Sequence, residues 1–233
     1  MLGENFIVLS GAGVSAESGI PTFRDAGGLW HNHAIEEVAT PEAWATNPQR
    51  VLDFYNWRRH SLLKAKPNAA HYLIARLEQY FNVQVITQNV DDLHERAGST
   101  QVLHLHGELR KVRSCGNPED VLPWDGPLRL SDRCRAGHPL RPHIVWFGEE
   151  VVEINRAMAM IPTADMLLVI GTSLQVYPAA GLLGLAPPGC RIFYLDPDPG
   201  PLRTTSDWQV RVIAAPATVG MKVLYEELGL PTD

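Results

Sequence analysis

A charged side chain lies on the apolar face of a predicted helix over residues 47–62. Asn47 is a suitable N-cap and is followed by proline at the first helical position, so the helical register is well marked. At 3.6 residues per turn, Arg58 falls on the stripe that should be buried, which also contains Val51, Tyr55 and Leu62. An arginine on a helix usually extends to solvent or pairs with a structural carboxylate. Because the Tyr55 hydroxyl lies one turn earlier, this pair also suits a small carboxylate ligand in a pocket.

His106 is a candidate general base. It directly follows the apolar run Val102–Leu105, and Gly107 after it allows close approach of a ligand. A lone histidine is more often structural than catalytic. However, its position among polar loops and an ordinary pKa of roughly 6.5 suit proton transfer.

A third group of polar side chains ends the apolar run Val83–Thr87. Gln88 and Asn89 come first, and Asp91 follows two positions later. Asp91 can cap the helix that ends near Gly98, which is the simplest account of one carboxylate. Capping does not explain the two amides.

A glycine-rich loop follows the first apolar run. Residues 11–16 fit the pattern G-x-G-x-x-A, in which glycines allow a pyrophosphate to approach the backbone. The pattern alone is weak evidence. No second strand ends in an acidic residue about 20 positions on, as in dehydrogenases. Instead, a long loop contains Phe23 and Arg24 and resembles a lid over a ligand.

The elements that carry these residues indicate an α/β fold. Six short apolar runs are continuous rather than alternating, which predicts strands covered on both faces. Helical patterns such as Asn68–Phe81 and Val151–Met160 lie between most of them, so we expect a doubly wound parallel sheet whose carboxyl ends hold the ligand. The predicted strands are Phe6–Leu9, Val83–Thr87, Val102–Leu105, Met166–Ile170, Arg191–Leu195 and Val210–Ile213.

Composition narrows the class of protein. The chain has 233 residues, of which 45% are hydrophobic, enough for one large domain with a small insertion. The formal net charge of −6 argues against nucleic-acid and anionic-membrane partners. Three cysteines without a framework pattern suit a reducing compartment, and the run Phe6–Leu9 is too short for a signal or membrane segment. We expect a cytoplasmic protein.

Five motifs, in this order along the chain, together carry a resemblance. They are GAGVSAESGIPTFRD, TQNVDDLHERAG, HLHGEL, LRPHIVWFGE and GTSLQVYPAAG. The chain resembles the sirtuins, which are NAD-dependent protein lysine deacylases. The segment FYNWRR, with its Tyr-x-x-Arg, resembles the class III branch, whose members prefer succinyl- and malonyl-lysine and often keep deacetylase activity.

The resemblance implies one catalytic domain over residues 1–233. Its Rossmann-like, NAD-binding part would comprise approximately residues 1–30, 68–107 and 144–233. Insertions over approximately residues 31–67 and 108–143, which do not fit the strand–helix alternation, would form a smaller lobe.

The resemblance also assigns roles to residues. His106 matches the catalytic histidine, with Asn89 and Asp91 beside it. The implied NAD site consists of Gly11, Ala12, Gly13, Ser15, Phe23, Arg24, Trp30, Gln88, Asn89, Asp91, Gly171, Thr172, Ser173, Asp196 and Ala217. At Asp196 many relatives have an asparagine, so that contact departs from the family pattern. The implied acyl-lysine site consists of Ala39, Tyr55, Arg58, Val145, Phe147, Gly148, Glu149, Val176 and Tyr177.

The implied reaction needs no metal. The acyl oxygen attacks the nicotinamide ribose as nicotinamide leaves, and His106 accepts a ribose hydroxyl proton so that the hydroxyl closes on the imidate carbon. Addition of water then releases lysine and O-acyl-ADP-ribose. The protein substrate would lie between two strands, an arrangement that tolerates many sequences. Two alternatives use the same pocket: mono-ADP-ribosyl transfer, and an NAD or ADP-ribose sensor without turnover. Retention of His106, Asn89 and Asp91 argues against the sensor.

The clearest departure from the family concerns zinc. A closed structural site usually has four ligands, often two Cys-x-x-Cys pairs. Only Cys115 and Cys134 are present in the corresponding region, with His138 as a further potential ligand, and Cys190 lies far away in the sequence. We therefore expect a degenerate site without bound zinc.

Overall fold

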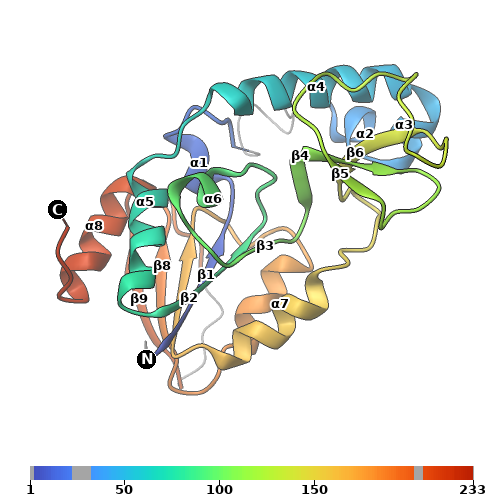
Figure 1. Ribbon diagram of the computed structural model, residues 1–233. Helices are drawn as coiled ribbons and strands as arrows, with labels where there is room; N and C mark the ends of the chain where they lie inside the picture. Colours follow the sequence, from blue (N-terminus) through green and yellow to red (C-terminus); the bar gives the residue numbers. More distant parts are fainter. Residues whose placement is uncertain (1–2, 23–32, 202–206, 233) are drawn as a thin grey trace.

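A six-stranded parallel sheet forms the larger part of the molecule. The computed structural model describes residues 3–22, 33–201 and 207–232. The strand order β3-β2-β1-β7-β8-β9 confirms the predicted doubly wound α/β fold (Figure 1). The strands are β1 (Asn5–Ser10), β2 (Asn82–Thr87), β3 (Val102–His104), β7 (Met166–Ile170), β8 (Arg191–Leu195) and β9 (Gln209–Ile213).

Both faces of this sheet are covered, which explains its continuous apolar strands. Phe6 and Val8 of β1 pack with α5 (Ala69–Arg76) and α8 (Ala217–Glu227). Ile7 and Leu9 point to the opposite face. That face is covered by α7 (Ile154–Met160) and the 3-10 helices η2 (Ile161–Thr163) and η3 (Ala179–Leu185).

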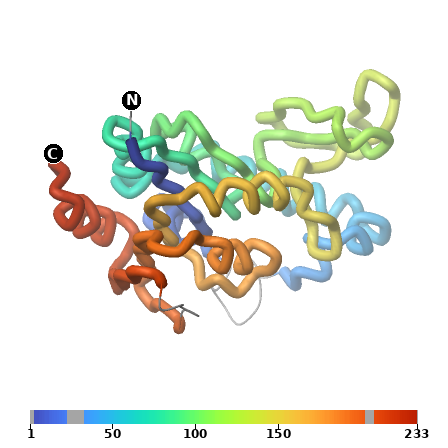
Figure 2. The backbone as a smooth tube through the Cα atoms, turned by 90° about the horizontal axis from the view of Figure 1, so that it is seen from below, coloured from blue at the N-terminus to red at the C-terminus, as the bar shows by residue number. Residues whose placement is uncertain are grey.

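The remaining elements form a smaller lobe beside the sheet. Its antiparallel sheet has the order β5-β4-β6 and packs against the long helix α4. Figure 2 shows an elongated molecule with α8 and the β4–β6 segment at opposite ends. The lobe contains α2 (Ile35–Val38), α3 (Pro41–Thr46), α4 (Pro48–Lys64), β4 (Gly107–Ser114), β5 (Val121–Pro123) and β6 (Leu140–Ile144).

Helix α4 begins where the sequence indicates. The Asn47 side chain accepts a hydrogen bond from the Arg50 N–H, and proline occupies the first helical position. Two other predicted helices are shorter than expected. The segment over residues 68–81 tightens into the 3-10 helix η1 (Leu77–Gln79) before β2, and α7 starts only at Ile154 because a turn precedes it.

Two short helices follow strands β1 and β2. Helix α1 (Gly13–Ala16) follows β1, and α6 (Leu93–Ala97) ends at Gly98, whose positive φ suits a helix C-terminus. Within the described part of the chain, no helix has both the length and the apolarity needed to cross a membrane.

Candidate active site

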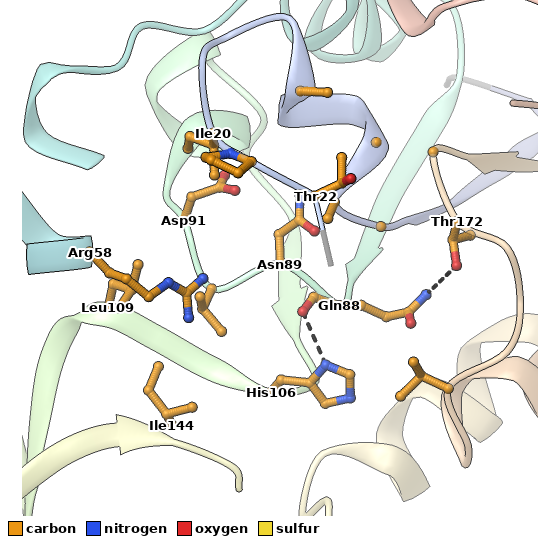
Figure 3. Close-up of a pocket in the computed structure, with 18 of the residues that line it drawn as sticks. Ile20, Thr22, Arg58, Gln88, Asn89, Asp91, His106, Leu109, Ile144 and Thr172 are labelled. Atoms are coloured by element: carbon orange, nitrogen blue, oxygen red, sulfur yellow. Dashed lines mark hydrogen bonds between the residues drawn. The ribbon is translucent and has the colours of Figure 1, made fainter. Parts of the chain in front are cut away.

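A cavity of about 590 Å³ opens between the carboxyl ends of the large sheet and the smaller lobe. Residues from both parts of the molecule line it (Figure 3). From the predicted NAD site it includes Gly11, Ala12, Gly13, Gln88, Asn89, Asp91, Gly171, Thr172, Ser173, Asp196 and Ala217, together with the predicted base His106. From the predicted acyl-lysine site it includes Ala39, Tyr55, Arg58, Val145, Phe147, Gly148, Glu149, Val176 and Tyr177.

Among the described residues, Ser15 is the one residue of the predicted NAD and acyl-lysine sites that does not line this wall. Ser15 is buried directly behind it. Phe23, Arg24 and Trp30 lie outside the described residues.

Two glycine loops meet at the floor of the cavity. A Cβ atom at Gly11 would lie 2.6 Å from the Thr172 side chain, and one at Gly13 would lie 2.7 Å from the Gly171 backbone. Gly171 itself has a φ of +61° and faces the backbone of Val14. Glycines are therefore required here for contact between the loops. They also line the cavity without side chains, which fits the close approach of a pyrophosphate.

His106 has one ring nitrogen fixed and the other available. Its Nδ1 lies 3.0 Å from the Gln88 carbonyl oxygen, which can only accept, so Nδ1 carries the proton (Figure 3). Nε2 is therefore unprotonated in the neutral ring and can accept a proton. Burial lowers the pKa of His106 and favours this neutral form, while the bond to Gln88 acts in the opposite direction. The Gln88 amide is held in turn by the Thr172 hydroxyl, 3.0 Å away.

Asp91 and Asn89 share one buried partner. The Ser15 hydroxyl donates to Asp91 Oδ2 at 3.0 Å and accepts from Asn89 Nδ2 at 3.1 Å. The second Asp91 oxygen accepts from the Leu93 N–H at the first residue of α6, but the N-cap position of this helix is Asp92, whose side chain makes no cap hydrogen bond. Burial raises the pKa of Asp91, whereas these two hydrogen bonds lower it. Asp91 is therefore not the N-cap residue, although its carboxylate satisfies the first N–H of α6 while it lines the cavity.

The predicted carboxylate-binding pair reaches the cavity from α4. Tyr55 is fully buried, and Arg58 extends toward the centre of the cavity near Asp91 (Figure 3). Desolvation lowers the pKa of Arg58 to about 10, with Tyr55 and Asp91 opposing the shift. The guanidinium therefore remains charged at neutral pH. Burial also raises the pKa of Tyr55 to about 12, so its hydroxyl stays protonated and can donate.

Glu149 lines the cavity, but its carboxylate is used within the protein. Arg141 Nη1 donates to it at 2.6 Å and Arg113 Nη2 at 3.1 Å. The Trp146 N–H donates to it at 2.8 Å. Glu149 therefore anchors the 145–149 segment to the β4–β6 sheet, and its side chain is not free for substrate.

Sequence reasoning missed two buried side chains near the site. Arg59, next to Arg58, is 1% exposed and donates to the Leu109 carbonyl oxygen at 2.7 Å, which ties α4 to β4. Trp146 donates through Nε1 to the Tyr55 hydroxyl at 3.1 Å. Leu52, Asn56 and Arg59 lie on one face of α4 at helical spacing. This spacing is a sequence signal that could have indicated a second buried face. No sequence pattern could reveal the Trp146 contact, which joins residues 91 positions apart.

The two cysteines of the smaller lobe do not fit a four-ligand zinc site. Cys134 is buried and its sulfur accepts a hydrogen bond from the Ser114 hydroxyl at 3.3 Å, while Cys115 is exposed. Among the described residues, no group of three or more His, Cys, Asp or Glu side chains is arranged to hold a metal ion. The apolar cluster of Leu52, Val112, Leu128 and Leu140 occupies the interior of this lobe instead.

Comparison with known proteins identifies the family. The sequence profile of the Sir2 family matches residues 11–178. The chain belongs to the Sir2 family. An NAD-dependent protein deacylase from Aggregatibacter actinomycetemcomitans is 57% identical over 193 residues, which cover 83% of this chain and 93% of that protein. One from Bacteroides thetaiotaomicron is 49% identical over 231 residues, with 97% and 98% of the two chains covered.

The fold is similar to that of solved Sir2 proteins. The crystal structure of a Sir2 homologue in complex with NAD superposes with a TM-score of 0.85 at 40% identity, covering 97% of this chain and 89% of that one. A mutant Sir2 homologue in complex with ADP-ribose superposes with a TM-score of 0.85 at 39% identity, covering 97% of this chain and 94% of that one. The predicted family and enzyme class, NAD-dependent protein deacylase, are confirmed at this level.

Proposed function

We propose that this sirtuin removes succinyl and malonyl groups, and also acetyl groups, from protein lysines, with NAD consumed and nicotinamide and O-acyl-ADP-ribose released. The observation that carries the acyl preference is the Tyr55–Arg58 pair in the cavity wall. A guanidinium and a phenol hydroxyl together match a carboxylate at the end of an acyl chain. An acetyl group has no such charge and needs neither side chain.

The residues of the large sheet would hold NAD. The loops at Gly11–Gly13 and Gly171–Ser173 would receive its phosphates and adenosine half, and Gln88, Asn89 and Asp91 its nicotinamide ribose. NAD, when bound, supplies the ribose carbon that accepts the acyl oxygen as nicotinamide departs. Close fit of both substrates within one cavity favours this reaction by orientation and by exclusion of water.

His106 would transfer the proton that the reaction requires. Its Nδ1 is engaged by the Gln88 carbonyl oxygen, so Nε2 is the atom that accepts a proton from a ribose hydroxyl. The main-chain N–H of Val145 donates to the His106 carbonyl oxygen at 3.0 Å. This contact fixes the proposed peptide-binding segment 145–149 relative to the base.

The protein substrate would bind at the cavity mouth between two chain segments, residues 145–149 and residues 176–177. The Phe147 N–H donates to the Ala39 carbonyl oxygen at 3.0 Å, which holds the 145–149 segment against the small residue at the acyl pocket. Tyr177 on the other segment is 76% exposed. Main-chain pairing between these segments and a peptide suits many protein sequences.

One assay tests the proposal. A single peptide is prepared with acetyl-, malonyl-, succinyl- and uncharged succinamoyl-lysine, and products are followed by mass spectrometry with and without NAD. We expect NAD-dependent deacylation and O-acyl-ADP-ribose, with succinyl favoured over its amide isostere. Equal rates on these two peptides would contradict the proposed preference. Transfer of ADP-ribose to the peptide would instead support the alternative chemistry.

A further inference from the structure

Trp146 donates a buried hydrogen bond to the Tyr55 hydroxyl oxygen. The indole Nε1 lies 3.1 Å from the Tyr55 hydroxyl oxygen in a buried contact. An indole N–H can only donate, so the hydroxyl oxygen must be the acceptor. The hydroxyl proton of Tyr55 is therefore left for a different acceptor.

Two ring contacts and one main-chain hydrogen bond hold Trp146 in place. The Arg141 guanidinium lies over its ring, 3.3 Å from the centroid, and the Trp146 main-chain N–H donates to Glu149. The Trp44 ring packs against it at 5.8 Å between centroids. Trp146 is only 2% exposed. Because the ring cannot rotate freely, its N–H is a fixed donor.

Glu149 connects this arrangement to the smaller lobe. It binds Arg141 through both carboxylate oxygens, at 2.6 and 3.0 Å, and Arg113 of β4 also donates to it. The guanidinium that stacks on the indole is thus itself immobilised. A cation over the ring face also withdraws electron density from the indole and strengthens its N–H as a donor.

We propose that Trp146 is a positioning residue for acyl selection, whose indole N–H orients the Tyr55 hydroxyl toward the carboxylate of a succinyl or malonyl group. This inference rests on the proposed function and adds a residue that does not itself touch the acyl group's charge. In this arrangement, Arg58 supplies the positive charge and Tyr55 donates a hydrogen bond to the acyl carboxylate. Trp146 sets the direction in which the Tyr55 hydroxyl donates.

The test removes the indole N–H while keeping an aromatic ring for Arg141. Trp146→Phe is compared with wild type by the ratio of kcat/KM for succinyl and acetyl forms of one peptide. We expect the ratio to fall about 3- to 10-fold, the loss of one neutral hydrogen bond. Trp208→Phe is the matched control: it removes an indole N–H that donates to the Ala186 carbonyl oxygen, away from the cavity wall, and keeps the Trp146–Tyr55 bond and its ring contacts, so its ratio should stay within about 2-fold of wild type.

A double-mutant cycle tests the route of the effect. In a Tyr55→Phe background the hydroxyl is absent, so Trp146→Phe should change the ratio by less than about 2-fold. Independent, multiplying effects of the two substitutions would overturn the proposal. An equal change in Trp208→Phe would also overturn it, because the ratio would then report a general loss of packing.

A second substitution covers the case in which Trp146→Phe does not fold. Replacement of Trp146 by 3-benzothienylalanine keeps the bicyclic ring and removes only the N–H. The same fall in the ratio supports the proposal, and an unchanged ratio overturns it. If the succinyl preference of wild type depends on Arg58 but is unchanged by substitution of Trp146, the inference about Trp146 fails and the proposed function stands. If wild type shows no such preference, the proposed function and the inference both fail.

Discussion

The imidazole of His106 and the main chain of Gln88 fix each other at the end of two adjacent strands. His106 Nδ1 donates to the Gln88 carbonyl oxygen at 3.0 Å. The Gln88 side-chain amide donates to the hydroxyl of Thr172 on the loop that follows β7. The tautomer of the base is thus set by the backbone of a neighbouring strand. A ligand that reaches this point meets Nε2 as an acceptor.

Substitution of His106 should stop the reaction without unfolding the protein. His106→Ala removes the proton acceptor, and loss of a general base alone lowers the rate roughly 10²- to 10⁴-fold. Turnover of the acetyl peptide is measured beside a circular dichroism melt. Near wild-type turnover in a folded variant would show that another group is the base.

The activity should persist in mildly acidic solution. Burial lowers the pKa of His106, so the ring remains neutral below its ordinary pKa of roughly 6.5. As pH falls, activity is lost only when the folded-state pKa is passed. The acid limb of the kcat profile at saturating NAD should therefore have its midpoint below about pH 6.5, and a midpoint above that value would contradict the prediction.

Two other histidines should make the fold sensitive to acid. Burial lowers the pKa of His71 to about 4 and that of His94 well below its ordinary value. Their rings are in contact, with centroids 5.1 Å apart. Both are neutral in the folded state, whereas the unfolded chain takes up protons below about pH 6.5. The free energy of unfolding should therefore fall as pH decreases from about 6.5 toward 4.

Denaturant titrations between about pH 8 and 4.5 measure how the free energy of unfolding depends on pH. Below about pH 6.5, each of the two histidines contributes a slope of up to about 1.4 kcal/mol per pH unit. His71→Asn should reduce the slope, while substitution of the exposed His60 by glutamine should leave it unchanged. Equal slopes for wild type and His71→Asn would show that His71 is not the source.

Metal removal should leave the protein intact. Only two thiols are present in the smaller lobe, and one of them is hydrogen-bonded to Ser114. A structural zinc site contributes about 10–16 kcal/mol, so its loss would unfold the lobe. We expect well under one zinc per chain by elemental analysis and the same Tm with and without a chelator. Stoichiometric zinc whose removal lowers the Tm would refute this.

The large sheet was predictable from sequence because its central strands β1, β7 and β8 are buried on both faces, although the edge strand β9 is mostly exposed. Two of the predicted strands, Met166–Ile170 and Arg191–Leu195, match the structure at both ends. The site residues that follow strands were predictable for the same reason, since parallel strands bring their carboxyl ends to one edge. Helix ends were less predictable, because the start of α7 depends on a turn and not on its apolar pattern.

Contacts between distant segments account for what the sequence did not reveal. The pattern of α4 identified Arg58 but not Arg59, whose partner is the main chain of Leu109. Glu149 was predicted to bind substrate, yet its two arginine partners come from β4 and β6. Such pairings depend on tertiary packing, and local periodicity contains no information about them.

Arg58→Met should separate the acyl groups. A carboxylate desolvated in the cavity needs the guanidinium, and loss of one partner of a buried charge pair costs roughly 2–5 kcal/mol. At about 1.4 kcal/mol per decade, kcat/KM for succinyl- and malonyl-lysine should fall on the order of 30- to 4,000-fold. Acetyl-lysine leaves no unpaired charge and should be affected far less. Tyr55→Phe should act in the same direction but more weakly, because it removes one neutral hydrogen-bond donor.

The measurement is the ratio of kcat/KM for succinylated and acetylated forms of one peptide, compared between wild type and Arg58→Met. Arg50→Met is the matched control, since Arg50 lies on the same helix, has a side chain that is 42% exposed and pairs with Glu37 at 2.6 Å. Its ratio should equal that of wild type, because a surface ion pair contributes little and lies outside the cavity wall. If Arg58→Met also left the ratio unchanged, Arg58 would be a structural charge, and the protein would act on acetyl-lysine without selecting a carboxylate.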